Sequence, residues 1–129
     1  MSAFRHAAGI QLAQVQLPPH ATPATIFSPP DTGDDFEVTL IMFCNPSDEA
    51  RTVRLFHDDD GITFAESTAL LWDLSIGVGE TYIFNASTLN GGIAVSAAGA
   101  LGASCDSDGL ITATVYGVPG QPDTETALT

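Results

Sequence analysis

Side chains able to do chemistry are most concentrated in the run His57-Asp58-Asp59-Asp60-Gly61. Calcium sites collect carboxylate oxygens on loops that contain glycine, so the run suggests a bound cation. An EF-hand loop with Gly61 at its sixth position would begin at Phe56 and end at Ser67, and neither supplies the carboxylate that such a loop needs. We therefore expect an exposed turn whose aspartates cap backbone N–H groups, and no metal site. The sequence leaves open whether the Asp58–Asp60 turn binds a cation.

Residues for acid–base or nucleophilic catalysis are scattered along the chain. The three histidines are His6 and His20, in a proline-rich stretch, and His57 at the end of a predicted strand. No GxSxG-like elbow presents a serine to any of them. Asp73 and Glu80 could serve as the acid and base of a glycosidase, but a chain with sixteen acidic residues offers many such pairs. We therefore predict no catalytic residues and no enzyme.

Cofactor motifs are also missing from the sequence. The pair Gly91-Gly92 lacks the spacing and the following lysine of a phosphate-binding loop, and a hairpin bulge explains it better. Cys44 and Cys105 have neither metal-ligand nor redox CxxC spacing, so we interpret both as small apolar residues. The sequence therefore predicts no cofactor and no cofactor-binding residues.

The aromatic residues Trp72, Tyr82, Phe84 and Tyr116 could form a platform for sugar binding. The first three, however, alternate in phase with apolar strand positions such as Leu74, which predicts that they face a core. We therefore expect Trp72, Tyr82 and Phe84 to be packed inside the protein.

Composition excludes several classes of partner. The chain has 129 residues, 44% of them hydrophobic, and a formal net charge of −13 with no lysine, which suits one globular domain. Nucleic acids and anionic lipids attract clustered cations, so neither is an expected partner. Polar residues and glycines interrupt the longest uncharged stretch, 81–105, which predicts no membrane-spanning helix. Three glutamines between positions 11 and 16 interrupt any signal segment, so we expect synthesis in the cytoplasm.

Hydrophobic alternation predicts an all-β fold. Six strands, separated by turn residues about every 8 to 12 positions, are expected at 36–45, 51–57, 70–76, 80–84, 93–97 and 111–116. Weaker patterns predict two more strands at 10–17 and 24–27. We expect one hairpin at the turn after residue 45 and another between Gly77 and Gly79. About eight strands indicate an antiparallel β-sandwich of jelly-roll-like type.

The ends of the chain differ in composition from its middle. Residues 1–33 hold five of the eight prolines, which predicts an extended proline-rich N-terminal arm that reaches a neighbour. Residues 34–118 are the predicted sandwich domain. Residues 119–129 have almost no large apolar side chain, which predicts a solvated C-terminal tail.

Several turn motifs resemble those of small virion structural proteins of tailed bacteriophages. The motifs are Cys44-Asn45-Pro46-Ser47, the run Asp58-Asp59-Asp60-Gly61-Ile62-Thr63, Thr68-Ala69-Leu70 and Gly79-Glu80-Thr81. The resemblance covers residues 36–118 and concerns turns and strand edges, so it identifies a sandwich scaffold better than a role.

The resemblance implies a structural protein of the virion without enzymatic activity. We expect a capsid decoration (cement) protein that is a homotrimer, binds the major capsid protein and lies on the outer capsid surface after synthesis in the host cytoplasm. The alternative is a tail or fibre module that binds host glycan or another tail protein. The sequence leaves open the head or tail location, the copy number, the oligomeric state and the receptor.

Overall fold

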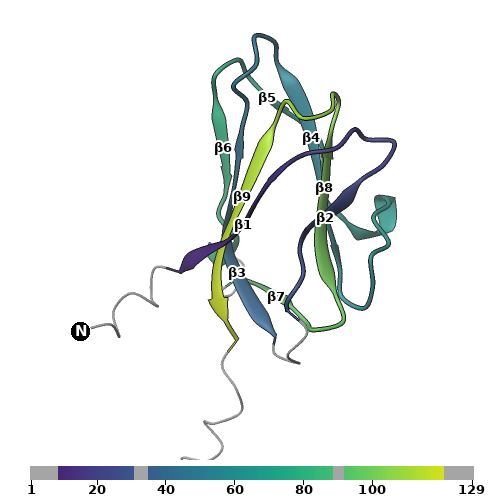
Figure 1. Cartoon of the computed structure of the whole chain (residues 1–129), viewed down its shortest axis with the longest axis vertical. Helices are drawn as coiled ribbons and strands as arrows, with labels where there is room; N and C mark the ends of the chain where they lie inside the picture. The colour runs from purple at the N-terminus through teal and green to yellow at the C-terminus, as the bar shows by residue number, and fades with distance from the viewer. Residues whose placement is uncertain (1–8, 31–34, 89–91, 121–129) are drawn as a thin grey trace, which may run out of the picture.

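The structure is a computed structural model that describes residues 9–30, 35–88 and 92–120. Within these ranges the chain forms strands and short 3₁₀ turns, arranged as two antiparallel sheets packed face to face (Figure 1). The strands are β1 (Ile10–Gln16), β2 (Ala24–Phe27), β3 (Phe36–Cys44), β4 (Arg51–Asp58), β5 (Ala69–Ile76), β6 (Thr81–Phe84), β7 (Ile93–Val95), β8 (Ala100–Cys105) and β9 (Thr112–Pro119). The predicted all-β sandwich is confirmed. No described helix has the length and hydropathy needed to cross a bilayer.

The order of the strands is that of a jelly roll. Sheet A has the order β1-β9-β3-β6, and sheet B has the order β2-β8-β4-β5. β6 and β7 share one position in sheet A, because β3 pairs with β6 over residues 41–44 and with β7 over residues 36–38. With these two strands counted together, each sheet has four positions, as in a sandwich built of two Greek keys.

The two predicted hairpins are wrong. The turn after β3 leads from sheet A to β4 in sheet B, and the turn after β5 leads from sheet B back to β6 in sheet A. The hairpin that does form joins β4 and β5, which pair in sheet B across the longer connection at residues 59–68. Turn residues indicate where the chain reverses, but they do not say which sheet the next strand joins.

The sequence patterns miss β8, which lies in the middle of sheet B between β2 and β4. All six of its residues are buried, so its sequence ALGASC shows no alternation of apolar and polar positions. A glycine inside a strand also weakens the pattern, yet here it is required: a Cβ on Gly102 would lie 2.5 Å from the ring of Phe64. β8 therefore consists mainly of small residues because other parts of the protein pack closely against both of its faces.

Most of the predicted N-terminal arm belongs to the sandwich. β1 pairs with β9 and β2 pairs with β8, so residues 10–27 supply an edge strand to each sheet. Prolines are tolerated beside edge strands, and Pro18 closes the segment by accepting a hydrogen bond from the N–H of Cys105 at 2.8 Å. Residues 10–27 therefore belong to the sandwich, and the predicted boundary at residue 33 does not divide them from it. Residues 1–8 and 31–34, and residues 121–129 of the predicted tail, lie outside the described residues. Pro119, where the tail was predicted to begin, is the last residue of β9.

The core lies between the sheets and uses alternate residues of each strand. Sheet A contributes Ile41 and Phe43, both with no exposed surface, and sheet B contributes Val53 and Leu55. Tyr82 and Phe84 pack against this core, which confirms that part of the prediction.

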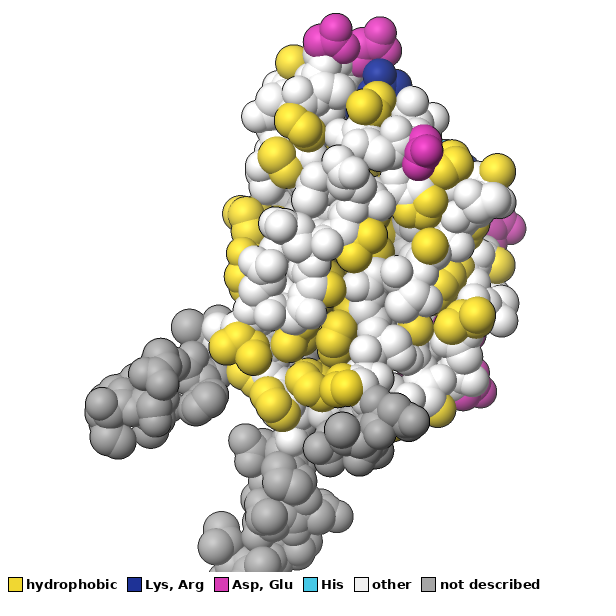
Figure 2. All heavy atoms as spheres, in the orientation of Figure 1, with side chains coloured by type: hydrophobic (Ala, Val, Ile, Leu, Met, Phe, Trp, Pro, Cys, Tyr) yellow, Lys and Arg dark blue, Asp and Glu magenta, His cyan; other side chains and the backbone are white. Residues whose placement is uncertain are grey.

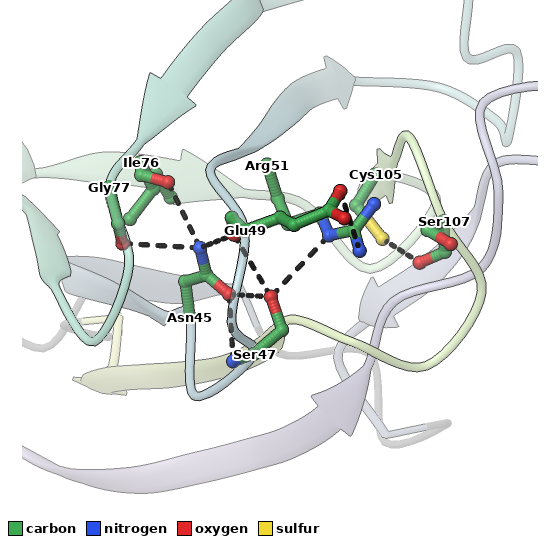
Figure 3. A network of polar contacts seen from close by, with 8 residues as sticks. All are labelled: Asn45, Ser47, Glu49, Arg51, Ile76, Gly77, Cys105 and Ser107. Atoms are coloured by element: carbon green, nitrogen blue, oxygen red, sulfur yellow. Dashed lines mark hydrogen bonds and ion pairs between the residues drawn. The ribbon is translucent and has the colours of Figure 1, made fainter.

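A buried asparagine joins the two sheets at one end of the sandwich (Figure 3). Asn45 has no exposed surface, and its Nδ2 donates to the backbone carbonyls of Glu49, Ile76 and Gly77 at 2.8, 3.0 and 3.1 Å. Its Oδ1 accepts from the backbone N–H of Ser47 at 3.0 Å, which closes the predicted local turn. Because one side chain bonds to both crossover turns, it fixes the spacing of the sheets at this end.

Candidate functional site

The outer surface of sheet B carries a cluster of polar and aromatic side chains that are joined by hydrogen bonds and ring contacts. In β4, Val53 and Leu55 face the core, so Thr52, Arg54 and Phe56 alternate outward. For Thr52 and Arg54, this orientation is the one that the alternation within residues 51–57 predicts. The outward residues meet side chains from β5, β8 and the segment before β2. We call this surface the Trp72 face; it comprises His20, Thr52, Arg54, Phe56, Phe64, Trp72, Asp73 and Ser104.

Trp72 is not in the core, and this expectation from the sequence is wrong. Its side chain is 44% exposed. The cause is a bulge in β5: Val53 pairs with Leu74 and Leu55 pairs with Leu71, so Trp72 and Asp73 together lie opposite Arg54. Asp73 has a φ of 54°, a left-handed conformation that is rare for a residue other than glycine. The bulge shifts the alternation by one residue and turns the indole outward.

Arg54 is held between an aromatic ring and a carboxylate. Its guanidinium lies over the indole of Trp72, with 3.8 Å between Cζ and the ring centroid. Its Nε donates to Oδ1 of Asp73 at 2.7 Å, and its Nη2 donates to Oδ2 at 3.3 Å. This bond to Arg54 is the main reason that the pKa of Asp73 lies below its ordinary value. The three side chains therefore hold one another in a fixed arrangement at the surface.

A layer of aromatic rings supports the indole. Phe56 meets Trp72 edge to face, with ring centroids 6.3 Å apart, and stacks on Phe64 with centroids 5.9 Å apart. Phe64 lies over Gly102, whose lack of a side chain makes room for the ring. Phe56 is buried although it points away from the core, because this layer covers it. The position of Trp72 is therefore set by packing below it.

His20 brings the hydroxyls of this surface together. Its Nδ1 is 2.7 Å from Oγ of Ser104, and its Nε2 is 3.1 Å from Oγ1 of Thr52 and 3.6 Å from Oδ1 of Asp73. Burial, with a further contribution from Arg54, lowers the pKa of His20 below its ordinary value, so the neutral ring is favoured near neutral pH. A neutral ring can donate a hydrogen bond from Nε2 and accept one from the Ser104 hydroxyl at Nδ1.

A serine, a histidine and an aspartate in contact suggest a hydrolase, so accessibility decides what this group can do. Ser104 has no exposed surface, and the ring of His20 lies against its hydroxyl. A substrate carbonyl therefore has no path to that oxygen in this conformation. Asp73 is also bonded to Arg54 at 2.7 Å, closer than the 3.6 Å to His20. The arrangement is suited to fixing a binding surface.

The acidic run at the end of β4 forms a turn of the kind that the sequence predicts. The carboxylate of Asp58 accepts from the backbone N–H groups of Thr63 at 2.7 Å and Asp60 at 3.2 Å. These bonds lower the pKa of Asp58, whereas its hydrogen bond and negative charge raise that of Asp60. Among the described residues, no group of His, Cys, Asp or Glu side chains has an arrangement that could hold a metal ion. Capping of backbone donors thus accounts for the position of Asp58.

The other residues considered as catalytic or ligand candidates lie apart from the Trp72 face. Glu80 accepts the N–H of Gly77 at 3.0 Å and closes its own turn. His57 lies on the core side of β4, and its Nε2 is buried without a hydrogen-bond partner among the described residues. Cys44 and Cys105 are free thiols, in β3 and β8 respectively. His6 lies outside the described residues.

The motifs that carry the phage resemblance also prove to be turn closures. Asn45, Asp58 and Glu80 each accept or donate hydrogen bonds within their own turns. These three residues therefore stabilise turns of the scaffold, and none of them belongs to the Trp72 face. Its members come from five separate segments: the one before β2, β4, the connection that contains Phe64, β5 and β8. The sequence alone predicts the outward positions of Thr52 and Arg54 but not the residues that surround them.

A scan against models of protein families finds no match for the chain, and a search of curated proteins finds none either. The function must therefore be inferred from the residues and geometry of this chain.

Proposed function

We propose that the protein is a non-enzymatic structural component of a phage virion. It binds the major capsid protein on the outer surface of the head and stabilises the shell as a decoration protein. The Trp72 face is the surface that docks. Synthesis in the host cytoplasm precedes attachment, and neither nucleic acid nor membrane takes part.

The observation that carries the docking surface is the exposed indole held by Arg54. Tryptophan and arginine are the residues most enriched among the side chains that dominate binding energy in protein interfaces. The indole is 44% exposed yet fixed by Arg54 and Phe56, so little conformational entropy is lost on binding. Leu70 and Ile62, at 41% and 72% exposure, add apolar surface from β5 and the preceding loop.

Two further features support a virion protein. The turn motifs at residues 44–47, 58–63 and 79–81 resemble those of small virion proteins. The jelly-roll strand order is one that capsid and lectin domains share, which is support at the level of fold alone.

A second candidate is a tail or fibre module that binds host glycan, and the exposure of Trp72 favours it. Sugars stack on indole rings and hydrogen-bond to carboxylates and hydroxyls. Arg54 covers one face of the indole, however, which leaves a smaller platform than an open ring. We therefore place the capsid-binding function first.

Copy number separates the two candidates. Densitometry of purified virions should give hundreds of copies per particle if the protein covers the shell, whereas a few tens or fewer would overturn the capsid proposal and support the tail.

Binding to particles stripped of the protein tests the surface. We expect Trp72→Ala to weaken binding at least about 30-fold, as for a dominant interface residue. Val78→Ala is the matched control, because Val78 is more exposed, at 58%, but lies in the turn between β5 and β6. Equal binding by Trp72→Ala and the wild type would exclude the Trp72 face as the docking surface.

A further inference from the structure

The outer surface of sheet A differs from the rest of this acidic protein. In β3 and β9 the core takes Ile41, Phe43, Ala113 and Val115, so the residues between them point outward. The same alternation holds in β1 and β6. Between residues 40 and 44 of β3, and beside them in β9, β1 and β6, the outward set is uncharged and consists of Gln14, Gln16, Leu40, Met42, Cys44, Thr81, Ile83, Thr112, Thr114 and Tyr116. The charged outward residue Glu37 lies on the other side of the bulge after Val38 and is not part of this set. We call this surface the uncharged face.

Apolar side chains run across the uncharged face from strand to strand. Ile83 is 52% exposed and pairs with Met42, which in turn pairs with Thr114 of β9. Leu40 and Tyr116 form the next pair along, and both are half-buried by their neighbours alone. In Figure 2 the margin over β6 shows hydrophobic and uncharged atoms, while acidic side chains gather at the upper end and along the opposite margin. An exposed apolar sheet face of this kind marks an interaction site.

The absence of charge from this face indicates which partner covers it. The chain carries sixteen acidic residues and a net charge of −13, so two copies repel one another wherever their acids meet. Across a two-fold axis each residue near the axis meets its own copy, and like charges there are destabilising. Glutamine and threonine are donors and acceptors at once, and methionine and isoleucine pack against themselves, so this set is self-complementary. A differently charged partner would gain nothing from a face that lacks charge.

We propose that the uncharged face binds a second copy of this chain in a two-fold dimer, in place of the homotrimer that the phage resemblance implies. The proposal is independent of virion attachment, because stacking sheet A on sheet A leaves both copies of the Trp72 face on the outside. It assigns the contact to residues of β1, β9, β3 and β6. It also places the thiol of Cys44 in the interface, whereas Cys105 is buried within each chain.

Sedimentation equilibrium of the full chain tests the dimer. We expect the wild type to be a dimer at about 50 μM and Ile83→Glu to raise its dissociation constant at least about 30-fold, because two added charges meet in a desolvated contact. Ile62→Glu is the matched control, since it makes the same change at a more exposed position outside this face and should leave the constant unchanged. A monomeric or trimeric wild type, or equal constants for Ile83→Glu and the wild type, would overturn the proposal.

Thiol labelling gives a second measurement that does not depend on a variant folding. Cys44 should react with Ellman's reagent more slowly as the protein concentration rises through the dissociation constant. A rate for Cys44 that is independent of concentration, while the chain dimerises, would place the dimer contact on another surface.

Discussion

The two outer faces of the sandwich are covered in different ways. On sheet B the chain lays its own side chains over the strands, with Phe64 on Gly102 and Arg54 on Trp72. On sheet A the outward residues Leu40, Met42 and Tyr116 are half-buried by neighbouring strands of the same sheet. One face thus has a built and charged layer, and the other is flat and uncharged. The two surfaces of this short chain therefore differ in chemistry, and we propose a different partner for each.

The comparison depends on the two sheets staying locked together, and the largest effect is expected where Asn45 joins them. Asn45→Ala removes three donated hydrogen bonds from a fully buried position and with them the link between the two crossover turns. The carbonyls of Glu49 and Gly77 each keep a second donor, Ser47 Oγ and the N–H of Glu80 respectively. We expect unfolding in urea to show a loss of about 2 to 4 kcal/mol.

Asn45→Asp isolates the donors, because it keeps Oδ1 and replaces only the Nδ2 group. It should be at least as destabilising as the alanine variant, since a buried carboxylate would face three carbonyl oxygens. If both variants lose less than about 1 kcal/mol, the network does not hold the sheets.

The next largest effect on stability is expected in the aromatic layer on sheet B. Gly102→Ala places a methyl group 2.5 Å from the ring of Phe64 and must displace that ring or the strand. We expect a loss of about 1 to 3 kcal/mol, together with a change in the fluorescence of Trp72, the single tryptophan of the chain. An unchanged stability and spectrum would mean that Phe64 does not cover β8.

Trp72 itself should matter less to stability than a core residue. Trp72→Ala should cost about 1 kcal/mol, whereas Phe43→Ala, at a position with no exposed surface, should cost about 3 to 5 kcal/mol. Chemical denaturation of both variants under the same conditions measures the difference. Equal losses of unfolding free energy in the two variants would indicate that the indole is buried in the core.

The smallest effect concerns pH and His20. The folded-state pKa of His20 lies below the ordinary value of 6.5, so the unfolded chain binds the proton more readily. The contribution of His20 to stability is complete above pH 6.5 and is lost as the pH falls from there through the folded-state pKa. Melting temperatures measured between about pH 8 and about pH 5 should fall, and His20→Gln should flatten that part of the curve. An identical slope in the variant would assign the pH dependence to another group.

Sequence patterns predict the elements with strong alternation and fail where packing breaks the alternation. The patterns predict β3 and β4 to within one residue at each end because one face of each strand meets the core, whereas β9 continues three residues beyond its predicted end. β8 was missed because its small residues are covered on both sides. Trp72 was misplaced because the bulge at Asp73 cannot be recognised from residue types alone.

The Trp72 face could be predicted only in part for a related reason. Arg54 was expected to point outward, but its partners come from β5, β8 and the segment before β2. Contacts such as the one between His20 and Ser104, 84 residues apart in sequence, depend on the order of strands in sheet B. The turn residues do not reveal that order, because both turns predicted as hairpins join strands of different sheets.

A cryo-electron microscopy map of the intact virion tests the central claim most directly. We predict density for the sandwich at repeated positions on the outer head surface, with Trp72 and Arg54 against the capsid protein. Density confined to the tail, or a sandwich that meets the shell through β3 and β6 instead, would contradict the proposed function and its docking surface.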